Sequence, residues 1–417
     1  MGRTDFSLGV SGGGRLYPLM ELPALALLSI LVLVCYLFEV SSARTRIPSV
    51  LLLLGLGMAL RPVCATLGWS LPGLARLLPE IGTAGLILIV LEGALELRFS
   101  RARAPLIWRS LFLAAVTMAL LAVGLAYALT ALVGCDFRTG LLNALPFSVI
   151  SSAVAVPTSR LLGAEDAEFI IYESAFSDIL GVLAFNFFLA NEVIGSAAVK
   201  SFFLQLSWSA LLAFGGTMLL AFLISRLRHR VKFGPILALV ILLYSVAKHY
   251  HLPALLLILV LGLFLANFRK LDRFPRLAFL RPDSLEPEVR RFDELLGELT
   301  FVVRIAFFLL FGFLIDFTQL FRTDVLLWAG GTLLAAYALR AGLLRLAGQR
   351  LAPVGFVAPR GLITVLLLLQ LPPAVRLARV DDALVTQVVI FSALVMMAGT
   401  AGAARRTTAD SAGHEPA

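Results

Sequence analysis

The sequence reads IIYESAFSDILGVLAFNFF from Ile170 to Phe188. This stretch is apolar enough to span a bilayer, yet it carries Glu173 and Asp178 at a depth where an ionised carboxylate requires a partner or water. On a helix, Ser174 lies one turn from Asp178 on the same face, whereas Glu173 and Ser177 share a different face. The pattern therefore predicts that Asp178 and Ser174 face a hydrated cavity and that Glu173 faces a buried cation.

The composition of the whole chain is that of a polytopic membrane protein. Of its 417 residues 60% are hydrophobic and only 15% are charged, and the mean hydropathy is +0.95. The net charge of +9 does not indicate a nucleic-acid partner, because the basic residues lie in short segments between apolar ones. Cys35, Cys64 and Cys135 show no metal-binding spacing, so we expect no transition metal and no cofactor.

A hydropathy window of about 19 residues, with helices ended at Pro, Gly and charge clusters, predicts an all-α fold with about thirteen transmembrane helices. Most of the 35 Lys and Arg residues then fall in alternate segments, which predicts an outer N-terminus, a cytoplasmic C-terminus and a bacterial inner membrane. The predicted spans are 21–40, 47–62, 80–98, 107–134, 139–160, 167–191, 200–226, 233–250, 252–268, 298–316, 323–347, 355–372 and 383–402.

Two of these spans are poor continuous helices. The span 139–160 contains Pro146 and Pro157, and the span 355–372 contains Pro359, Arg360 and Gly361 near its start. Unwound backbone at membrane depth is tolerated where protein or a water-filled cavity satisfies it, and paired broken helices indicate a transporter's binding site. We therefore expect the two spans to occupy matching places in an inverted repeat.

Several motifs in order resemble those of NhaP-type sodium/proton antiporters. SSAVAVP at Ser151–Pro157 is similar to the family's unwound TDPVAV, and ESAFSD at Glu173–Asp178 is similar to its ESLxND. LEGAL at Leu91–Leu95, FVVRIAFFLLFGFLID at Phe301–Asp316 and PRGLITV at Pro359–Val365 resemble its FEGAL, its Arg-bearing span and its RG-containing broken helix. The resemblance implies an inverted-repeat antiporter fold with two crossed broken helices, and a homodimer.

The chain departs from the family pattern at the expected ion site. Ser152 stands where the family has the Asp of TDP, Ala153 where it has Pro, and Ser177 where it has the Asn of ND. The site has therefore lost one carboxylate, although a hydroxyl oxygen can still coordinate a small hard cation.

The resemblance, together with the spacing, assigns roles to individual residues. An alkali cation and a proton are expected to compete at Asp178, and Glu92 is expected on the cation path. Ser174 and Ser177 have a second interpretation, as small residues that bond to the backbone at a helix interface. The hydroxyls expected at the ion are Ser151, Ser152, Ser174 and Ser177.

The arginines inside spans also receive predictions. Glu173 is expected to form a structural ion pair with Arg304, because a buried Arg must be paired. Arg360 is expected to stabilise the ends of the broken helices, although a snorkelling arginine is the alternative. Lys248, at the end of a span, is expected at the membrane interface.

The predicted organisation has a core that moves against a scaffold. Residues 107–191 and 323–402 form the two halves of the core, and 298–322 form an Arg-bearing linking helix. The other predicted segments are a disordered N-terminus at 1–20, scaffold or dimerisation helices at 21–106, further scaffold helices with a cytoplasmic loop at 200–297, and a short cytoplasmic tail at 403–417.

The function that this organisation predicts is electroneutral exchange of a monovalent cation, Na⁺ or else K⁺ or Li⁺, for H⁺ by alternating access. Two other functions remain open: a carrier of the same design that moves an organic anion with sodium, and a non-transporting sensor or regulatory protein. An enzyme is not expected, because the spans contain no nucleophile, His/acid pair or metal-ligand cluster.

Overall fold

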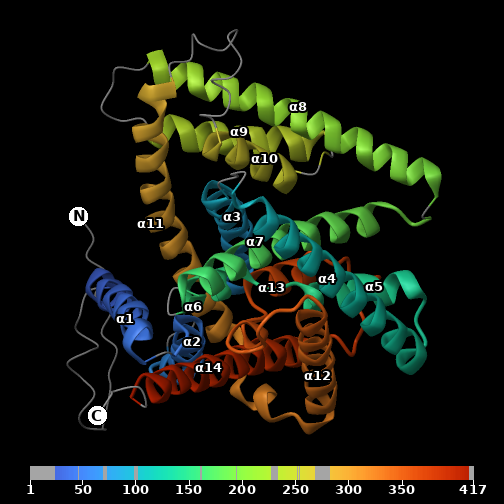
Figure 1. Ribbon diagram of the computed structural model, residues 1–417. Coiled ribbons are helices and arrows are strands. Elements are labelled where there is room, and N and C mark those ends of the chain that lie inside the picture. The colour runs from blue at the N-terminus through green and yellow to red at the C-terminus, as the bar shows by residue number, and fades with distance from the viewer. Residues whose placement is uncertain are drawn as a thin grey trace, which may run out of the picture.

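The computed structural model describes residues 24–45, 47–68, 73–97, 102–159, 162–193, 195–226, 233–250, 252, 254–267 and 282–412. Within these residues the regular structure is entirely helical (Figure 1). The helices are α1 (Ala24–Thr45), α2 (Ser49–Thr66), α3 (Leu74–Glu96), α4 (Ala104–Val133), α5 (Phe137–Ser148), α6 (Ser152–Ser159), α7 (Ala164–Ala190), α8 (Ser196–Arg226), α9 (Phe233–His249), α10 (Ala254–Ala266), α11 (Pro282–Leu314), η4 (Phe317–Phe321), α12 (Thr323–Leu346), η5 (Val354–Phe356), α13 (Leu362–Leu369) and α14 (Asp382–Ala412).

Nine helical segments of the described chain are long and apolar enough to cross a membrane, with α5 and α6 counted together as one span. Three shorter apolar helices, in α1, α9 and α10, accompany them. With the segment around α13 they correspond to the predicted spans, which confirms the all-α polytopic membrane fold. The chain is an integral membrane protein.

Both predicted breaks are present. Helix α5 ends at Ser148 and α6 begins at Ser152, and the chain between η5 and α13 is unwound from Val357 to Gly361. The two unwound stretches meet, because the backbone N–H of Ser151 donates to the carbonyl of Pro359 at 2.9 Å. Proline explains part of this geometry, since it lacks the N–H that a continuous helix requires.

Helix packing separates two groups of elements. Helix α11 packs along α2 and α3, and α10 packs on α3 and α8, whereas α4 packs on α5 and α7, and α12 packs on α14 and α4. In Figure 1, α8 to α10 lie together at the top of the view and α12 and α14 at the bottom, with α6, α7 and α13 between them.

Glycines allow α2 and α11 to approach unusually closely. A Cβ added at Gly57 would collide with the Leu309 carbonyl of α11, and one added at Gly312 would collide with the Leu54 carbonyl of α2. The Arg-bearing helix therefore packs as part of the layer formed with α2 and α3.

Two predicted boundaries differ from the structure. Helix α11 begins at Pro282, well before the predicted start at 298, because the charged stretch before Gly297 continues the helix instead of ending it. Helix α14 continues to Ala412, beyond the predicted span end at 402, so the first part of the predicted tail at 403–417 is helical. The predicted disordered N-terminus at 1–20, residues 269–281 of the predicted cytoplasmic loop and residues 413–417 lie outside the described residues.

Candidate functional site

Asp178 lies near the middle of α7 and is only 4% exposed. Its Oδ2 accepts two hydrogen bonds from the first residue of α6: one from the Ser152 hydroxyl and one from the Ser152 backbone N–H at 3.1 Å. Its Oδ1 is buried and has no hydrogen-bond partner among the described residues. One oxygen of the carboxylate is therefore hydrogen-bonded, and the other is available to bind an ion.

Ser151 contributes a second available oxygen at the same break. Its backbone N–H bonds to Pro359, but its buried hydroxyl has no partner within the described chain. A Cβ added at Gly361 would lie 2.8 Å from this hydroxyl oxygen, so only glycine fits there without displacing Ser151. The position where the two broken spans meet thus combines a carboxylate oxygen and a hydroxyl oxygen of the kind that bind alkali cations.

Ser174 and Ser177 are buried, and their hydroxyls contact backbone. The hydroxyl of Ser174 donates to the carbonyl of Ile170 at 2.8 Å, one turn back in α7. The hydroxyl oxygen of Ser177 accepts from the backbone N–H of Ile150, at 2.9 Å, in the unwound stretch. These contacts match the structural interpretation of both serines, and Ser177 positions the break directly against α7.

Arg360 joins the ends of the broken helices. Its side chain is 2% exposed, its Nε donates to the carbonyl of Phe147 in the last turn of α5 at 2.5 Å, and its Nη1 donates to the carbonyl of Ala358 at 3.0 Å. Its backbone N–H donates to the Ser392 hydroxyl of α14 at 2.9 Å. A guanidinium beside carbonyls that have lost their helical partners is the arrangement expected from the sequence, and a snorkelling side chain is not observed.

The predicted ion pair between Glu173 and Arg304 is wrong. Glu173 pairs instead with Arg340 of α12, in a bidentate contact of 2.5 Å from Nη1 to Oε1 and 2.7 Å from Nη2 to Oε2. Arg340 also donates to the Val354 carbonyl of η5 at 3.1 Å. Both side chains are buried, so the pair links α7 to the second half of the chain inside the protein.

Arg304 has a different partner because it lies on α11, away from α7. Its Nη2 is 3.6 Å from Oε1 of Glu39 on α1, and the two side chains are 15% and 28% exposed. The general expectation of a cation opposite Glu173 was correct, but the sequence alone did not identify which of the intramembrane arginines supplies it.

The pair of Arg304 and Glu39 belongs to the wall of a cavity of about 320 Å³. We call it the glutamate cavity, because its lining carries four glutamates and one arginine. Ser152 of α6 and Ala175 of α7 also line it, and Ala175 lies one turn from Asp178. The charged lining residues are Glu39, Glu92, Glu294, Glu298 and Arg304.

Glu92, the acidic residue expected on the cation path, is one of the residues that line this cavity. Its carboxylate extends alongside α11, since a Cβ added at Gly297 would lie 3.6 Å from Glu92 Oε1. Ser152 connects the cavity to the buried carboxylate, because it both lines the cavity and donates to Asp178. The cavity thus ends at the hydrogen bond that holds Asp178.

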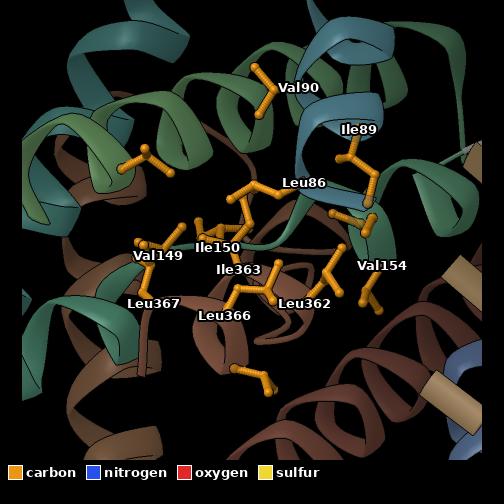
Figure 2. Close-up of a cluster of buried hydrophobic side chains, with 14 of the residues drawn as sticks. Leu86, Ile89, Val90, Val149, Ile150, Val154, Leu362, Ile363, Leu366 and Leu367 are labelled. Carbon is orange, nitrogen blue, oxygen red and sulfur yellow. The ribbon is translucent and has the colours of Figure 1, made fainter. Parts of the chain in front are cut away.

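An apolar layer lies on the other side of this position. Figure 2 shows Leu86, Ile89 and Val90 of α3 clustered with side chains from both broken spans. Ile89 also lines the glutamate cavity, whereas Leu86, one turn earlier in α3, is 1% exposed. The side chains from the broken spans are Val149, Ile150, Val154, Leu362, Ile363, Leu366 and Leu367.

Sequence reasoning missed three side chains that position the site. Arg340 was visible as a basic residue within an apolar span, and that signal was sufficient to expect a buried acid opposite it. Ser392 and Asn143 gave no signal, because an isolated Ser or Asn in an apolar span is common. Asn143 is fully buried and bonds across to the chain after α13, donating to the Val375 carbonyl at 2.7 Å and accepting from the Leu377 N–H at 3.1 Å.

Comparisons with known proteins agree with this geometry. A family model described as Sodium/hydrogen exchanger, transmembrane, matches residues 29–402. The structure of the sodium proton antiporter MjNhaP1 from Methanocaldococcus jannaschii at pH 8 is similar, with a TM-score of 0.68 at 17% identity over 91% of this chain and 97% of that chain. A 3D EM map of the same antiporter gives a TM-score of 0.67 at 16% identity over 91% and 96%. No curated protein matches significantly.

Proposed function

Since the chain belongs to the sodium/hydrogen exchanger family, we propose that it exchanges Na⁺ for H⁺ across the membrane, with both ions occupying Asp178 in turn. K⁺ and Li⁺ are the alternative cations. The chain is a transporter and not an enzyme. The observation that carries the proposal is the buried Asp178 carboxylate at the end of the glutamate cavity, with one oxygen bonded to Ser152 and the other without a partner in the described residues.

The mechanism is competition for one carboxylate. Asp178 Oδ1 binds either a proton or a cation, and the Ser151 hydroxyl offers a further oxygen to the cation. Neutralisation of the buried charge by either ion lowers the cost of moving the site through the apolar layer, so only the loaded core changes its access. One carboxylate cannot hold both ions, and this competition couples the two fluxes.

Electroneutral exchange follows from the charges around the broken spans. The buried charges of Glu173 and Arg340 cancel within their pair, and Arg304 belongs to the cavity wall. Asp178 is then the one exchangeable carboxylate that the described core presents, because Ser152 and Ser177 replace the other polar residues of the family motifs. One proton and one monovalent cation give the loaded core the same charge, which supports a one-for-one exchange.

The decisive experiment uses purified protein in proteoliposomes. We expect Asp178→Asn to abolish Na⁺-driven proton flux, because the amide cannot exchange a proton at working pH. Glu165→Gln is the matched control, since Glu165 is an exposed acid in the first turn of the same helix, and its flux should equal that of the wild type. Clamping the membrane potential with K⁺ and valinomycin should leave the wild-type flux unchanged.

The proposal fails if Asp178→Asn exchanges as fast as the wild type. A wild-type protein that is monodisperse and thermally stable but moves no ion would instead favour the sensor function. Flux that reverses with the sign of the voltage at equal ion gradients would refute the one-for-one stoichiometry alone.

The setting of the transporter is also part of the proposal. The distribution of Lys and Arg favours a cytoplasmic C-terminus in a bacterial inner membrane, with the glutamate cavity open to the cytoplasm because it contacts the inner ends of α1 and α3. The family resemblance favours a homodimer formed by the scaffold helices. Native mass spectrometry in lipid nanodiscs would measure the oligomeric state, and a monomer would contradict it.

A further inference from the structure

A second cavity contacts the opposite end of α7. Its volume is about 540 Å³, and its lining includes Asn186 and Asn191 at the end of α7 together with Thr83 of α3 and Gln370 after α13. We call it the lysine cavity, because Lys248 of α9 is the charged side chain among its described lining residues. The orientation proposed above places it on the outer side.

Along α3, the apolar cluster of Figure 2 lies between residues that line the two cavities. Along α3, Thr83 lines the lysine cavity, Leu86 lies in the layer and Ile89 lines the glutamate cavity. The two cavities therefore lie towards opposite ends of α3 and α7, with Leu86 between them along α3. A residue in either cavity acts on ions that approach from that face.

The fixed charges of the two ends have opposite sign. The glutamate cavity carries four glutamates and Arg304, and Arg290 pairs with Glu294 at 3.3 Å near its rim. The lysine cavity carries Lys248 among neutral polar groups such as Tyr244 and Gln205. A concave surface with one sign of charge and low-dielectric walls concentrates ions of the opposite sign and depletes ions of the same sign.

We infer that Lys248 sets the sidedness of cation binding: it weakens capture of Na⁺ from the outer face, while the glutamate cavity favours capture from the cytoplasm. This inference rests on the proposed exchange of Na⁺ for H⁺. Lys248 determines selectivity between the two faces and does not bind the ion. Its side chain is exposed to the cavity, so its removal leaves the packing of α9 intact.

A positive charge repels protons as well as Na⁺, and this gives the inference a distinctive signature. At alkaline outer pH, where protons do not compete, the positive charge lowers the Na⁺ concentration near the cavity. The wild type should therefore need more Na⁺ in solution to reach half-maximal flux. At acidic outer pH the charge depletes Na⁺ and its competitor H⁺ by the same factor. The half-saturating Na⁺ concentration should therefore not depend on the charge. The final ion gradients reached at equilibrium should not change at any pH, because the fixed charge is present both when the protein carries Na⁺ and when it carries H⁺.

The experiment compares right-side-out and inverted membrane vesicles that contain Lys248→Gln, Lys248→Glu or the charge-preserving Lys248→Arg. With Na⁺ on the outer face at alkaline pH and low salt, Lys248→Gln should lower the half-saturating Na⁺ concentration by about twofold to fourfold, and Lys248→Glu should lower it further. Lys248→Arg should match the wild type. The shift should shrink when choline chloride raises the ionic strength, since salt screens exposed charges.

Lys200→Gln is the matched control. Lys200 is an exposed lysine in the first turns of α8, at the same end of the bundle, and it does not appear in the cavity lining. Its removal should leave the half-saturating concentration unchanged. The reciprocal variant Glu298→Gln, in the glutamate cavity, should raise the half-saturating concentration only when Na⁺ is presented to the cytoplasmic face.

An equal shift for Lys248→Gln and Lys200→Gln, or a Lys248→Gln shift that persists at acidic outer pH, would overturn the inference while exchange itself continues. A wild-type protein without Na⁺-dependent flux from either face would refute the proposed function and, with it, the sidedness. The two failures are therefore distinguished by the wild-type flux alone.

Discussion

Two arginine–glutamate pairs in this protein differ in almost every physical respect. Arg340 and Glu173 are fully enclosed, and two short hydrogen bonds fix their planes against each other. Arg304 and Glu39 are 3.6 Å apart, make a single contact and face a cavity. The first pair joins α7 to α12, and the second lies between α11 and α1.

The difference shows what each pair contributes. Charges removed from water are costly unless they are paired, so either member of the buried pair requires the other for the fold to remain intact. Charges that line a cavity keep more of their solvation than fully enclosed ones, and a single contact at 3.6 Å gives only a weak attraction. The buried pair therefore acts on stability, whereas the cavity pair acts on the electrostatic potential that an approaching ion experiences.

The largest effect is expected at the buried pair. Glu173→Ala and Arg340→Ala should each lower the free energy of unfolding by about 3–5 kcal/mol, because each strands a buried charge. The double alanine variant should lose much less than the sum of the two single losses. Thermal unfolding of the detergent-purified variants measures all three.

A neutral replacement provides the control for this prediction. Glu173→Gln combined with Arg340→Met removes both charges at similar volume and should be more stable than either single alanine variant. Simple additivity of the two alanine losses would contradict the pairing.

An intermediate effect is expected at Asp381, which combines an ion pair with a helix cap outside the span of α14. Its Oδ2 is 2.6 Å from Arg322 Nη1, and its Oδ1 accepts from the N–H of Leu384 at 3.0 Å. Asp381→Ala should cost about 1 kcal/mol through the lost cap, and Asp381→Asn should recover most of it because the amide oxygen still caps. Equal melting temperatures for the two variants would show that the cap is unimportant.

The smallest effect on stability is expected at the cavity pair. Arg304→Gln and Glu39→Gln should each change the free energy of unfolding by less than about 1 kcal/mol, the usual range for a solvated pair. Thermal unfolding at low and high salt provides the measurement. A loss as large as that of Arg340→Ala would show that the Arg304 charge behaves like a buried one. The two pairs would then not differ in their contribution to the free energy of unfolding.

The sequence alone was sufficient for the helical architecture and for much of the candidate site. Apolar length together with Pro, Gly and charge clusters located each span. Pro359 lies within one unwound stretch, whereas Pro146 and Pro157 lie in the helices on either side of the other. The motif resemblance placed Ser152 among the hydroxyls expected at the ion site, and the structure brings it against Asp178.

The sequence was insufficient where the answer depended on tertiary packing. Arg304 and Arg340 both lie in apolar stretches of their helices, and only the tertiary structure shows that Arg304 faces Glu39 of α1 and Arg340 faces Glu173. Helical periodicity placed Ser174 on the face of Asp178, but its hydroxyl satisfies the Ile170 carbonyl instead. The early start of α11 was missed because charged residues end a membrane span without ending a helix.

The close approach at Gly57 and Gly312 has a mechanical consequence. With main chain against main chain, no side chain remains between α2 and α11 that changes rotamer to absorb a displacement, so the pair is stiff across its width. Glu294, Glu298 and Arg304 all extend from this stiff helix into the glutamate cavity. Under the proposed alternating-access mechanism, this charged wall would stay fixed while Asp178 moves relative to it. The electric field at Asp178 would then change through the motion of the aspartate alone.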